Sequence, residues 1–420
     1  MQRRIPRLAA GLVAAAGVLA LTACGSGFSG SSGSSSSGAA GGLTSSKSAL
    51  TVLIGSSGDA ETAAVKSAVA DWSGTSGTKA SVQAATNLTQ QLSQGFAAKK
   101  PADVFYLGAD TFASYAKQGN LLAYGDQLKN KSDFYPSLVK NFTYDGKFTC
   151  APKDFSTLQL EINTDLWKAA GLTDQDVPTT WDQLATVAKK LTKGKVTGLV
   201  TSNEYQRLGA FMVQAGGNLT NDDNTKATVD SAANKQALTY VQSGLKDGWW
   251  KFTKDVGAGW GGEAFGKGVA AMTIEGNWIS GAMQSDFPKI KYQVAPLPAG
   301  PAGKGTLQFT NCWGIAADSP NQAAALKLVE KLTSSDDQLA FAKAFGVMPS
   351  IRSAAGDWKQ QYPQFAAFLD AADYAKGVPT AVGANDVVTD MNSKLASLKS
   401  ADIASILSTE QKNLSAVVTG

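Results

Sequence analysis

The residues able to do chemistry in this chain are carboxylates, amides and tryptophans, because histidine is missing. The 420 residues include no His, three Cys, nine Trp, and 34 Asp and Glu. Without His the chain cannot form a Ser-His-Asp or Cys-His nucleophile or a His-containing metal site. Three Cys are too few for a Cys₄ zinc site, so we expect neither a metal nor a cofactor.

Two glycine-rich segments are candidates for a phosphate-binding loop, and neither fits. Gly55–Gly58 lacks the spacing of G-x-G-x-x-G, and Gly257–Gly262 lacks the Lys and Ser/Thr of a P-loop. The charge balance also argues against nucleic acid as a partner. The net charge of +4 falls to +1 when Arg3, Arg4 and Arg7 are set aside as part of a removable leader. A near-neutral protein has no electrostatic footprint for a phosphate backbone.

Five of the nine tryptophans lie in one stretch of the sequence, at Trp249, Trp250, Trp260, Trp278 and Trp313. A tryptophan most often packs in a core, because it buries a large apolar area. We interpret Trp249 and Trp250 in this way, at the end of a helix. Trp260 in a glycine-rich loop and Trp278 beside an Asn are less natural core residues.

The elements that must position these residues alternate between strands and helices. The predicted strands lie at 49–54, 80–84 and 103–107, and the predicted helices at 59–72, 88–99, 110–118, 181–191, 234–246, 321–333 and 336–345. Asp59 is a good N-cap for the first helix. This order predicts an α/β fold with a parallel sheet, in which ligands bind beyond the carboxyl ends of the strands. The loops at 55–59 and 108–110 are therefore candidate ligand loops.

The N-terminus has the pattern of a removable leader followed by a lipid attachment site. Met1–Arg7 carries three Arg and no acid, and Leu8–Leu21 is an apolar run of 14 residues. A membrane-spanning helix needs about 20 apolar residues, so this run fits the core of a signal peptide at 1–23. Leu-Thr-Ala-Cys at 21–24 resembles the bacterial lipobox, which implies acylation of Cys24. Residues 24–48 form a Gly/Ser-rich linker with a reach of roughly 25–30 Å.

Seven segments of the remaining chain carry patterns that occur in the same order in one known family. They are 102–121, Phe148–Leu158, Asn163–Trp167, Val177–Asp182 (VPTTWD), Gly262–Met272, Glu275–Trp278 and Asn311–Ile315. Together they resemble the extracellular solute-binding proteins of ABC importers, in particular the carbohydrate-binding family that includes the maltose-binding proteins. The resemblance covers the chain from Ala49 to the C-terminus.

The resemblance implies an α/β, two-lobed fold of the periplasmic-binding-protein type, with hinge strands and a ligand cleft that closes by hinge motion. Lobe 1 would comprise residues 49–153 and 312–356, and lobe 2 residues 154–311 and 357–420. The implied function is that of a monomeric receptor with no catalytic residue, held at the outer face of the cell membrane by lipidated Cys24. It would capture a di- or oligosaccharide and deliver it to the permease subunits of an ABC importer.

The resemblance also suggests which residues hold the ligand. Sugars need hydrogen-bond partners for their hydroxyls and aromatic planes for their C–H faces, and acids, amides, Trp and Tyr supply both. The expected ligand-binding residues are Ser57, Asp59, Asp110, Asp154, Ser156, Trp260, Glu263, Glu275, Asn277, Trp278, Asn311 and Arg352. Leu107 replaces a tryptophan of the maltose-binding pattern, and the loop Gly377–Asp386 has no aromatic residue. Both departures disfavour maltodextrin.

A disulfide between Cys150 and Cys312 is a further implication of the resemblance. With Cys24 assigned to lipid, these two cysteines remain, and the compartment outside the membrane permits oxidation. Both lie in segments that match the family's crossover strands, which run side by side at the hinge. The alternative is a pair of buried free thiols.

Two other functions stay open at the level of sequence. An extracellular glycoside hydrolase needs two carboxylates and no His, and Glu263 with Glu275 would be the candidate pair. The same receptor fold could also take a polyamine, a phosphate ester or a metal chelate. An anion site would favour Arg and backbone amides over clustered Trp and acids, so the sequence favours a sugar.

Overall fold

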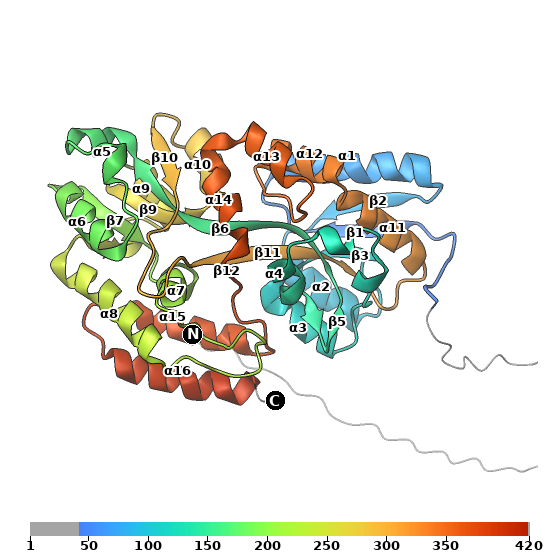
Figure 1. Cartoon of the computed structure of the whole chain (residues 1–420). Coiled ribbons are helices and arrows are strands. Elements are labelled where there is room, and N and C mark those ends of the chain that lie inside the picture. Colours follow the sequence, from blue (N-terminus) through green and yellow to red (C-terminus); the bar gives the residue numbers. More distant parts are fainter. Residues whose placement is uncertain (1–41, 419–420) are drawn as a thin grey trace, which may run out of the picture. The chain divides into compact units, whose positions relative to one another are not determined.

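The computed structural model describes residues 42–418 (Figure 1). The predicted signal peptide, Cys24 and most of the predicted linker lie outside the described residues. The chain from Leu43 onward forms one compact unit. Among residues 42–418, no helix is long and apolar enough to cross a membrane.

The end of the predicted linker is bound to the folded unit. The Thr44 N–H donates to Gln322 Oε1 at 3.0 Å, and the Thr44 hydroxyl donates to the Ser319 carbonyl at 2.7 Å. Asn321 Nδ2 donates to the Ser48 carbonyl at 3.0 Å. The flexible linker was expected to extend to Ser48. Its residues from Thr44 onward are instead bound by polar groups of residues 319–322, so the linker ends earlier.

The first part of the sheet is parallel, as predicted. β1 (Leu50–Ile54) pairs with β2 (Ala80–Ala84) and with β3 (Val104–Gly108), and the helices that follow these strands are α1 (Asp59–Ser76), α2 (Leu88–Ala97) and α3 (Ala109–Lys117). Gly58 is the N-cap of α1, and its carbonyl accepts from the Thr62 N–H at 3.1 Å. The prediction that Asp59 is the N-cap was wrong by one position, because Asp59 is the first residue of the helix.

The last part of the sheet is also parallel. β7 (Thr197–Thr201) lies between β9 (Ala270–Gly276) and β8 (Trp250–Phe252). The helices of this region are α6 (Trp181–Leu191), α7 (Tyr205–Gln214), α8 (Ala232–Asp247) and α9 (Gly261–Gly266). α6 has the predicted bounds, because Thr180 caps its first turn and the apolar face repeats with helical period.

Two long antiparallel strands, β6 (Ala151–Asn163) and β11 (Thr306–Ile315), join these parts into one sheet of order β2-β1-β3-β11-β6-β9-β7-β8. The C-terminal half of β11 pairs with β3, and residues 308–313 of β11 pair with β6. The C-terminal half of β6 pairs with β9. Figure 1 shows both strands running between the β1–β3 group and the β7–β9 group.

The remaining elements cover the sheet or pair at its margins. The short strands are β4 (Thr143–Tyr144), β5 (Lys147–Phe148), β10 (Tyr292–Ala295) and β12 (Ala375–Lys376). The other α-helices are α4 (Pro136–Asn141), α5 (Thr164–Ala169), α10 (Ile279–Ser285), α11 (Gln322–Leu332), α12 (Ser335–Phe345), α13 (Ala355–Gln361), α14 (Ala366–Asp370), α15 (Ala384–Leu395) and α16 (Ile403–Val418). Short 3₁₀ helices lie at Gly125–Gln127, Lys131–Asp133, Asp174–Asp176, Thr253–Val256, Pro363–Phe365 and Ala371–Asp373.

Two large hydrophobic clusters follow this division of the sheet. One is built from β1, β3, α1, α11 and the C-terminal half of β11, and the other from β7, β8, α6–α8, α15 and α16. Trp249 and Trp250 belong to the second cluster and are 3% and 0% exposed, which confirms the interpretation of this pair as core residues. A smaller cluster joins Phe155 of β6 to Met348, Trp358 and Phe368.

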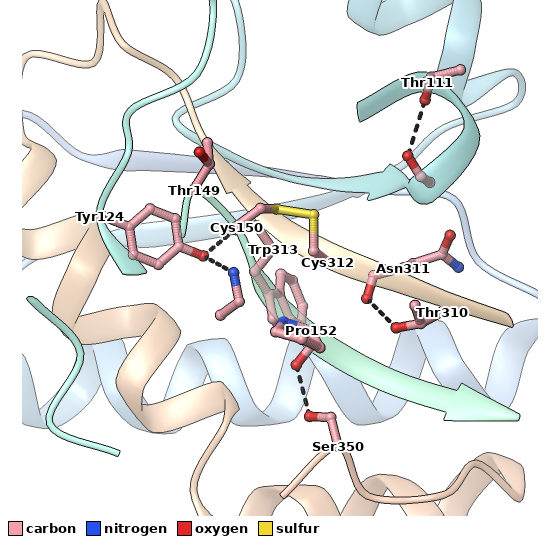
Figure 2. Close-up of a disulfide and its surroundings, with 12 residues drawn as sticks. Thr111, Tyr124, Thr149, Cys150, Pro152, Thr310, Asn311, Cys312, Trp313 and Ser350 are labelled. Atoms are coloured by element: carbon pink, nitrogen blue, oxygen red, sulfur yellow. Dashed lines mark hydrogen bonds between the residues drawn. A yellow bond between two sulfur atoms is a disulfide. The ribbon is translucent and has the colours of Figure 1, made fainter. Parts of the chain in front are cut away.

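The predicted disulfide is present where the N-terminal end of β6 meets the C-terminal half of β11. Cys150 and Cys312 are bonded, with a Cα–Cα distance of 5.6 Å, and both residues are fully buried (Figure 2). Cys312 lies opposite Pro152 in the β6–β11 ladder. The hydroxyl of Tyr124 accepts from the Ala151 N–H at 2.8 Å and donates to the Trp313 carbonyl, so it clamps the same end of both strands.

Reduction of this disulfide should lower stability substantially. The bond closes a loop between residues 162 positions apart, which corresponds to about 5 kcal/mol in the chain-entropy model, with smaller values often measured. Thermal melts with and without reductant check this, with a Cys150→Ala/Cys312→Ala double variant as the control. The double variant should show the same melting temperature under both conditions. An equal response of parent and double variant to reductant would contradict the prediction.

Candidate functional site

A cavity of about 460 Å³ lies over the paired crossover strands. β6 contributes residues 153–156 to its lining and β11 contributes residues 308–311. The loops after β1 and β3, both predicted ligand loops, line it as well. Further lining comes from the loop after β9, the end of α12, and the segment from Val378 to Val388. Strand ends from both parts of the sheet thus converge on one cavity.

The structure brings together seven of the twelve residues expected from the sequence. Those that line the cavity are Ser57, Asp110, Asp154, Ser156, Asn277, Trp278 and Asn311. Asp154 and Ser156 are nearly buried, whereas Asp110 and Asn311 are exposed at its rim. Asp59, Trp260, Glu263, Glu275 and Arg352 do not line it.

Trp260 and Glu263 lie elsewhere because each has a local structural partner. The Trp260 ring packs over Gly262, where an added Cβ would come within 2.1 Å of the ring, and against the small apolar cluster around α9. Glu263 accepts from the Gly259 N–H at 2.6 Å and pairs with Lys267 at 2.5 Å. The hydrogen bond from Lys267 holds the pKa of Glu263 below its usual value. Trp260 and Glu263, the expected stacking pair, therefore do not line the cavity.

The other two outlying residues are on the surface. Asp59 is exposed as the first residue of α1. Arg352 is exposed, its guanidinium lies 5.6 Å from the centre of the Tyr135 ring, and its N–H donates to the Asp133 carbonyl at 2.8 Å. Neither residue lines the cavity. The predicted loop 55–59 does line it, but through Gly55 and Ser57 and not through Asp59.

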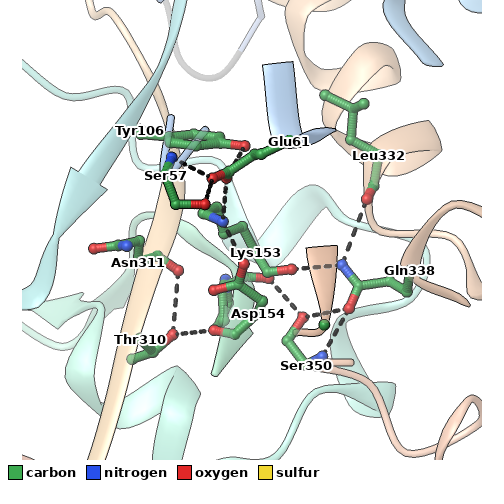
Figure 3. A network of polar contacts seen from close by, with 12 residues as sticks. Ser57, Glu61, Tyr106, Lys153, Asp154, Thr310, Asn311, Leu332, Gln338 and Ser350 are labelled. Carbon is green, nitrogen blue, oxygen red and sulfur yellow. Dashed lines mark hydrogen bonds and ion pairs between the residues drawn. The ribbon is translucent and has the colours of Figure 1, made fainter. Parts of the chain in front are cut away.

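A buried ionic cluster, defined here as Lys153, Glu61, Asp154 and Tyr106, lies at the cavity and was not predicted (Figure 3). Lys153 Nζ pairs with Glu61 Oε1 at 3.2 Å and with Asp154. The Tyr106 hydroxyl donates to Glu61 Oε1 at 3.0 Å, and Lys153 Nζ lies 4.4 Å from the Tyr106 ring centre. The Ser57 N–H and hydroxyl both donate to Glu61 Oε2, at 2.8 and 2.7 Å.

A β-bulge explains how Lys153 reaches these acids. Asn311 lies opposite Asp154 and Cys312 lies opposite Pro152, so Lys153 is the extra residue of β6. Successive side chains of a regular strand point to opposite faces, which would separate Lys153 from Asp154. A bulge redirects a side chain at this kind of position. Here it allows two adjacent residues to form a contact pair.

The electrostatics of the cluster keep Lys153 charged. Burial would lower its pKa, but the nearby acids Asp154, Tyr106 and Glu61 raise it above its usual value. Burial would raise the pKa of Glu61, but Lys153 and the two hydrogen bonds from Ser57 hold it below its usual value. Burial raises the pKa of Asp154, against the opposing effect of Lys153. The cluster thus contains two carboxyl groups and one ammonium group. Among the described residues, no other Lys or Arg lines the cavity.

Trp278 presents an aromatic surface to the cavity and is 38% exposed. Its ring packs edge-to-face with Phe309 at 5.6 Å, and the Arg207 guanidinium lies 5.2 Å from the ring centre. The ring also covers Gly276, where a Cβ would come within 2.2 Å of it, so only glycine fits there. The result is an exposed indole held from several directions.

Glu275 anchors this indole from behind. Its Oε2 accepts from Trp278 Nε1 at 3.0 Å and from Arg207 Nη2 at 2.6 Å. The expected role of Glu275 as a ligand contact is thus replaced by a positioning role, because its carboxylate is fully buried behind the ring. The hydrolase pair of Glu263 and Glu275 is not assembled, since one acid lies outside the cavity and the other is bound to Arg207.

Glu161 of β6 lies next to Glu275 and is also fully buried. Its Oε2 accepts from the Glu275 N–H at 3.0 Å, and its Oε1 has no hydrogen-bond partner. Burial raises the pKa of Glu161 well above its usual value, and the charge of Glu275 raises it further. The pKa of Glu275 is raised as well, mainly by burial, although Arg207 counteracts this effect. One arginine faces two carboxyl groups, and of the two it bonds to Glu275.

Sequence reasoning missed several residues that line the cavity: Glu61, Lys153, Asn141, Gln206, Gln308, Phe309, Phe345 and Asn385. Glu61 had a usable signal, because it lies one helical turn after Ser57 in a predicted ligand loop. Lys153 lies next to the predicted Asp154, but the bulge that redirects it has no sequence pattern. Within residues 42–418, no group of three or more His, Cys, Asp and Glu is placed to hold a metal ion.

The fold and the cavity agree with a comparison against known families. Residues 69–367 match the family model for bacterial extracellular solute-binding proteins. The chain belongs to this family. It is therefore a binding protein and not an enzyme, and the predicted α/β two-lobed fold is confirmed by solved structures of the same type.

Individual relatives show what the family members bind. The diacetylchitobiose-binding protein DasA of Streptomyces coelicolor is 28% identical over 290 residues, which span 65% of this chain and 66% of DasA, just under two thirds of its length. The cyclic α-maltosyl-1,6-maltose-binding protein of Arthrobacter globiformis has a TM-score of 0.79 at 19% identity, over 88% of this chain and 98% of that one. UgpB of Mycobacterium tuberculosis, solved with glycerophosphocholine, has a TM-score of 0.74 at 18% identity, over 88% and 98%. The fold alone does not determine the ligand.

Replacing Glu161 by Gln should make the protein more stable at neutral pH. A carboxyl whose folded-state pKa is raised binds a proton that the unfolded chain releases. Stability is therefore lost as pH rises from the unfolded value near 4.5 through the folded pKa. Gln mimics the protonated acid and removes this loss. Melting temperatures across pH 4 to 8 test it: parent and variant should agree near pH 4 and diverge above. A variant that is less stable at every pH would contradict the prediction.

Proposed function

We propose that this protein is a carbohydrate receptor that delivers its ligand to an ABC importer. The observation that carries the proposal is the exposed Trp278 indole, held in place by Glu275 and Arg207 within a cavity rich in acids and amides. An aromatic plane of this kind matches the C–H face of a pyranose ring. Asp110, Asn277 and Asn311 lie on the same cavity and supply hydrogen-bond partners for hydroxyls.

The charge of the cavity favours a neutral ligand over an anionic one. Lys153 is already paired with Glu61 and Asp154, so it has no free charge for a phosphate or carboxylate group. Bringing an anion beside these acids would add like-charge repulsion in a partly desolvated site. The alternative of a phosphate ester is therefore disfavoured, and a neutral sugar fits better.

The lobe boundaries also belong to this proposal. Residues 49–153 and 312–356 would form lobe 1, and residues 154–311 and 357–420 would form lobe 2. The two large hydrophobic clusters support this division, because one draws on residues 50–151 and 312–354 and the other on 158–307 and 384–414. The smaller cluster around Phe155 contains residues of both proposed lobes, which is expected at a hinge.

Delivery and location complete the proposal. A monomeric receptor would present its closed, ligand-bound form to the permease subunits of the importer. Cys24, once acylated, would hold it at the outer face of the membrane, with the Gly/Ser segment as a tether. The apolar run and the Leu-Thr-Ala-Cys pattern at residues 8–24 support this anchor, and the family's extracellular location agrees with it.

The cavity proposal predicts different results for two tryptophans. Trp278→Ala should weaken sugar binding by about 1–3 kcal/mol, the value of a large aromatic contact. Trp260→Ala is the matched control, because its ring packs on α9 outside the cavity, and its affinity should stay that of the parent. Isothermal titration with a panel of di- and oligosaccharides measures both, and intact recovery of the sugars checks for hydrolysis. Unchanged affinity in Trp278→Ala would reject the stacking model.

The anchor proposal predicts that Cys24→Ala detaches the protein from the membrane. Without the thiol no lipid can be attached, so the variant should appear in the medium or persist as an uncleaved precursor. Membrane fractionation and N-terminal mass analysis of the expressed full chain test this, with Ser26→Ala as the control. If Cys24→Ala fractionates with the membrane and is processed as the parent is, the anchor is misassigned.

A further inference from the structure

A second cavity, of about 180 Å³, adjoins the first. The two cavities share Asn141, Gln308 and Val378 in their linings. The second cavity extends from α4 and the short strand β12 to the loop at 218–224. Its lining is polar, with Thr220, Asp373 and Tyr374 among its residues. A cavity of this composition suits hydroxyl-rich chemistry better than an apolar group.

The side chain of Gln308 stands at the junction with an unused hydrogen-bond donor. Gln308 is 1% exposed, and its Oε1 accepts from the Ser137 hydroxyl at 3.1 Å. Its Nε2 has no hydrogen-bond partner. Its backbone is fixed by pairing with Thr157 in the crossover ladder, and its amide oxygen is held by Ser137. A buried donor without an acceptor is costly and is rare in native proteins.

A second amide at the same junction is also available. Asn141, at the end of α4, is 7% exposed, and its side chain makes no hydrogen bond with the described residues. Its Oδ1 lies close to Gly377, where an added Cβ would come within 2.4 Å of it. Gln308 and Asn141 therefore place a free donor and a second amide group between the two cavities.

The far wall of the second cavity is held in place by ion pairs. Lys376 pairs with Asp222 at 2.9 Å, and Lys140 of α4 pairs with Asp223 at 3.4 Å. The hydroxyl of Thr220 donates to Asn224 Oδ1 at 2.8 Å. These contacts connect the loop at 218–224 to α4 and to β12, so the second cavity has walls on several sides.

We propose that the two cavities form one binding site for an oligosaccharide longer than the first cavity alone can hold. The chain would extend past Gln308, whose Nε2 would donate to a ring, glycosidic or hydroxyl oxygen at the junction, and its end would lie against Asp373 and Tyr374. This inference rests on the proposed carbohydrate function and names the substrate class: oligomers rather than single sugars or disaccharides.

A length series of oligosaccharides tests the inference. The probes are oligomers of two to five units of α-1,4-glucose, β-1,4-glucose, β-1,4-N-acetylglucosamine and β-1,4-xylose, titrated calorimetrically into the full-length protein. The parent should bind the longer members of one series at least tenfold more tightly than its dimer. Gln308→Met, which keeps the volume but removes the donor at the junction, should lose most of this gain.

Two further variants separate the possible outcomes. Asp373→Ala changes an exposed residue that lines the second cavity and not the first, so it should lose affinity only for the longer oligomers, whereas Trp278→Ala should weaken all lengths. Gln308→Met removes the unpaired donor and also the acceptor of the partly buried Ser137 hydroxyl, so its melting temperature without sugar should change little. The inference would be overturned, and the carbohydrate function kept, by either of two results. One is a parent whose affinity does not increase beyond the dimer, and the other is long-oligomer binding by Gln308→Met and Asp373→Ala that equals that of the parent. No binding of any probe to the parent would overturn the carbohydrate function and the inference with it.

Discussion

The pairing of β6 with β11 is the constraint on which the rest of the site depends. These two strands connect both parts of the sheet, and their residues 153–156 and 308–311 line the cavity. The ladder also fixes the position of each side chain, because a shift by one residue would move every side chain to the other face. The disulfide and the Tyr124 clamp secure one end of the pair. They leave the other end free to join β9, so the two parts of the sheet stay connected without a bond across the cavity.

The buried ionic cluster serves specificity more than stability. The free energy needed to remove two carboxyl groups and an ammonium group from water offsets most of their mutual attraction. Such a cluster therefore contributes little to the net free energy of folding. What it does provide is a defined pattern of charge at the cavity. Lys153 is surrounded by Glu61, Asp154 and the Tyr106 ring, and it supports the acids without offering a cation to a ligand. A site with spare acceptors and no spare cation selects ligands with hydroxyl donors.

Sequence patterns predicted most of the fold because periodicity and caps act locally. β2 and α6 have the predicted bounds, and the crossover segments were found from their resemblance to known proteins. The site was predicted less completely, for two physical reasons. The bulge at Lys153 and the unpaired amide of Gln308 arise from the register of strands far apart in sequence. Trp260 and Trp278 also have similar sequence surroundings, with glycine and a glutamate within three residues of each. Only tertiary packing distinguishes them, because the Trp260 ring packs over Gly262 whereas the Trp278 ring lines the cavity.

The anchor of Trp278 is coupled in turn to Glu161, the second carboxyl group buried beside Glu275. Glu275 accepts from the indole N–H and from Arg207 through the same oxygen, Oε2, so the two contacts are coupled. Arg207 is the cation that acts on both buried glutamates, and of these two it bonds only to Glu275. If Glu161 lost its proton, two buried carboxylates would compete for one guanidinium, and the indole anchor would weaken. Burial of Glu161, which favours its neutral form, leaves the guanidinium to Glu275 and so supports the position of the indole, although Glu161 itself does not line the cavity.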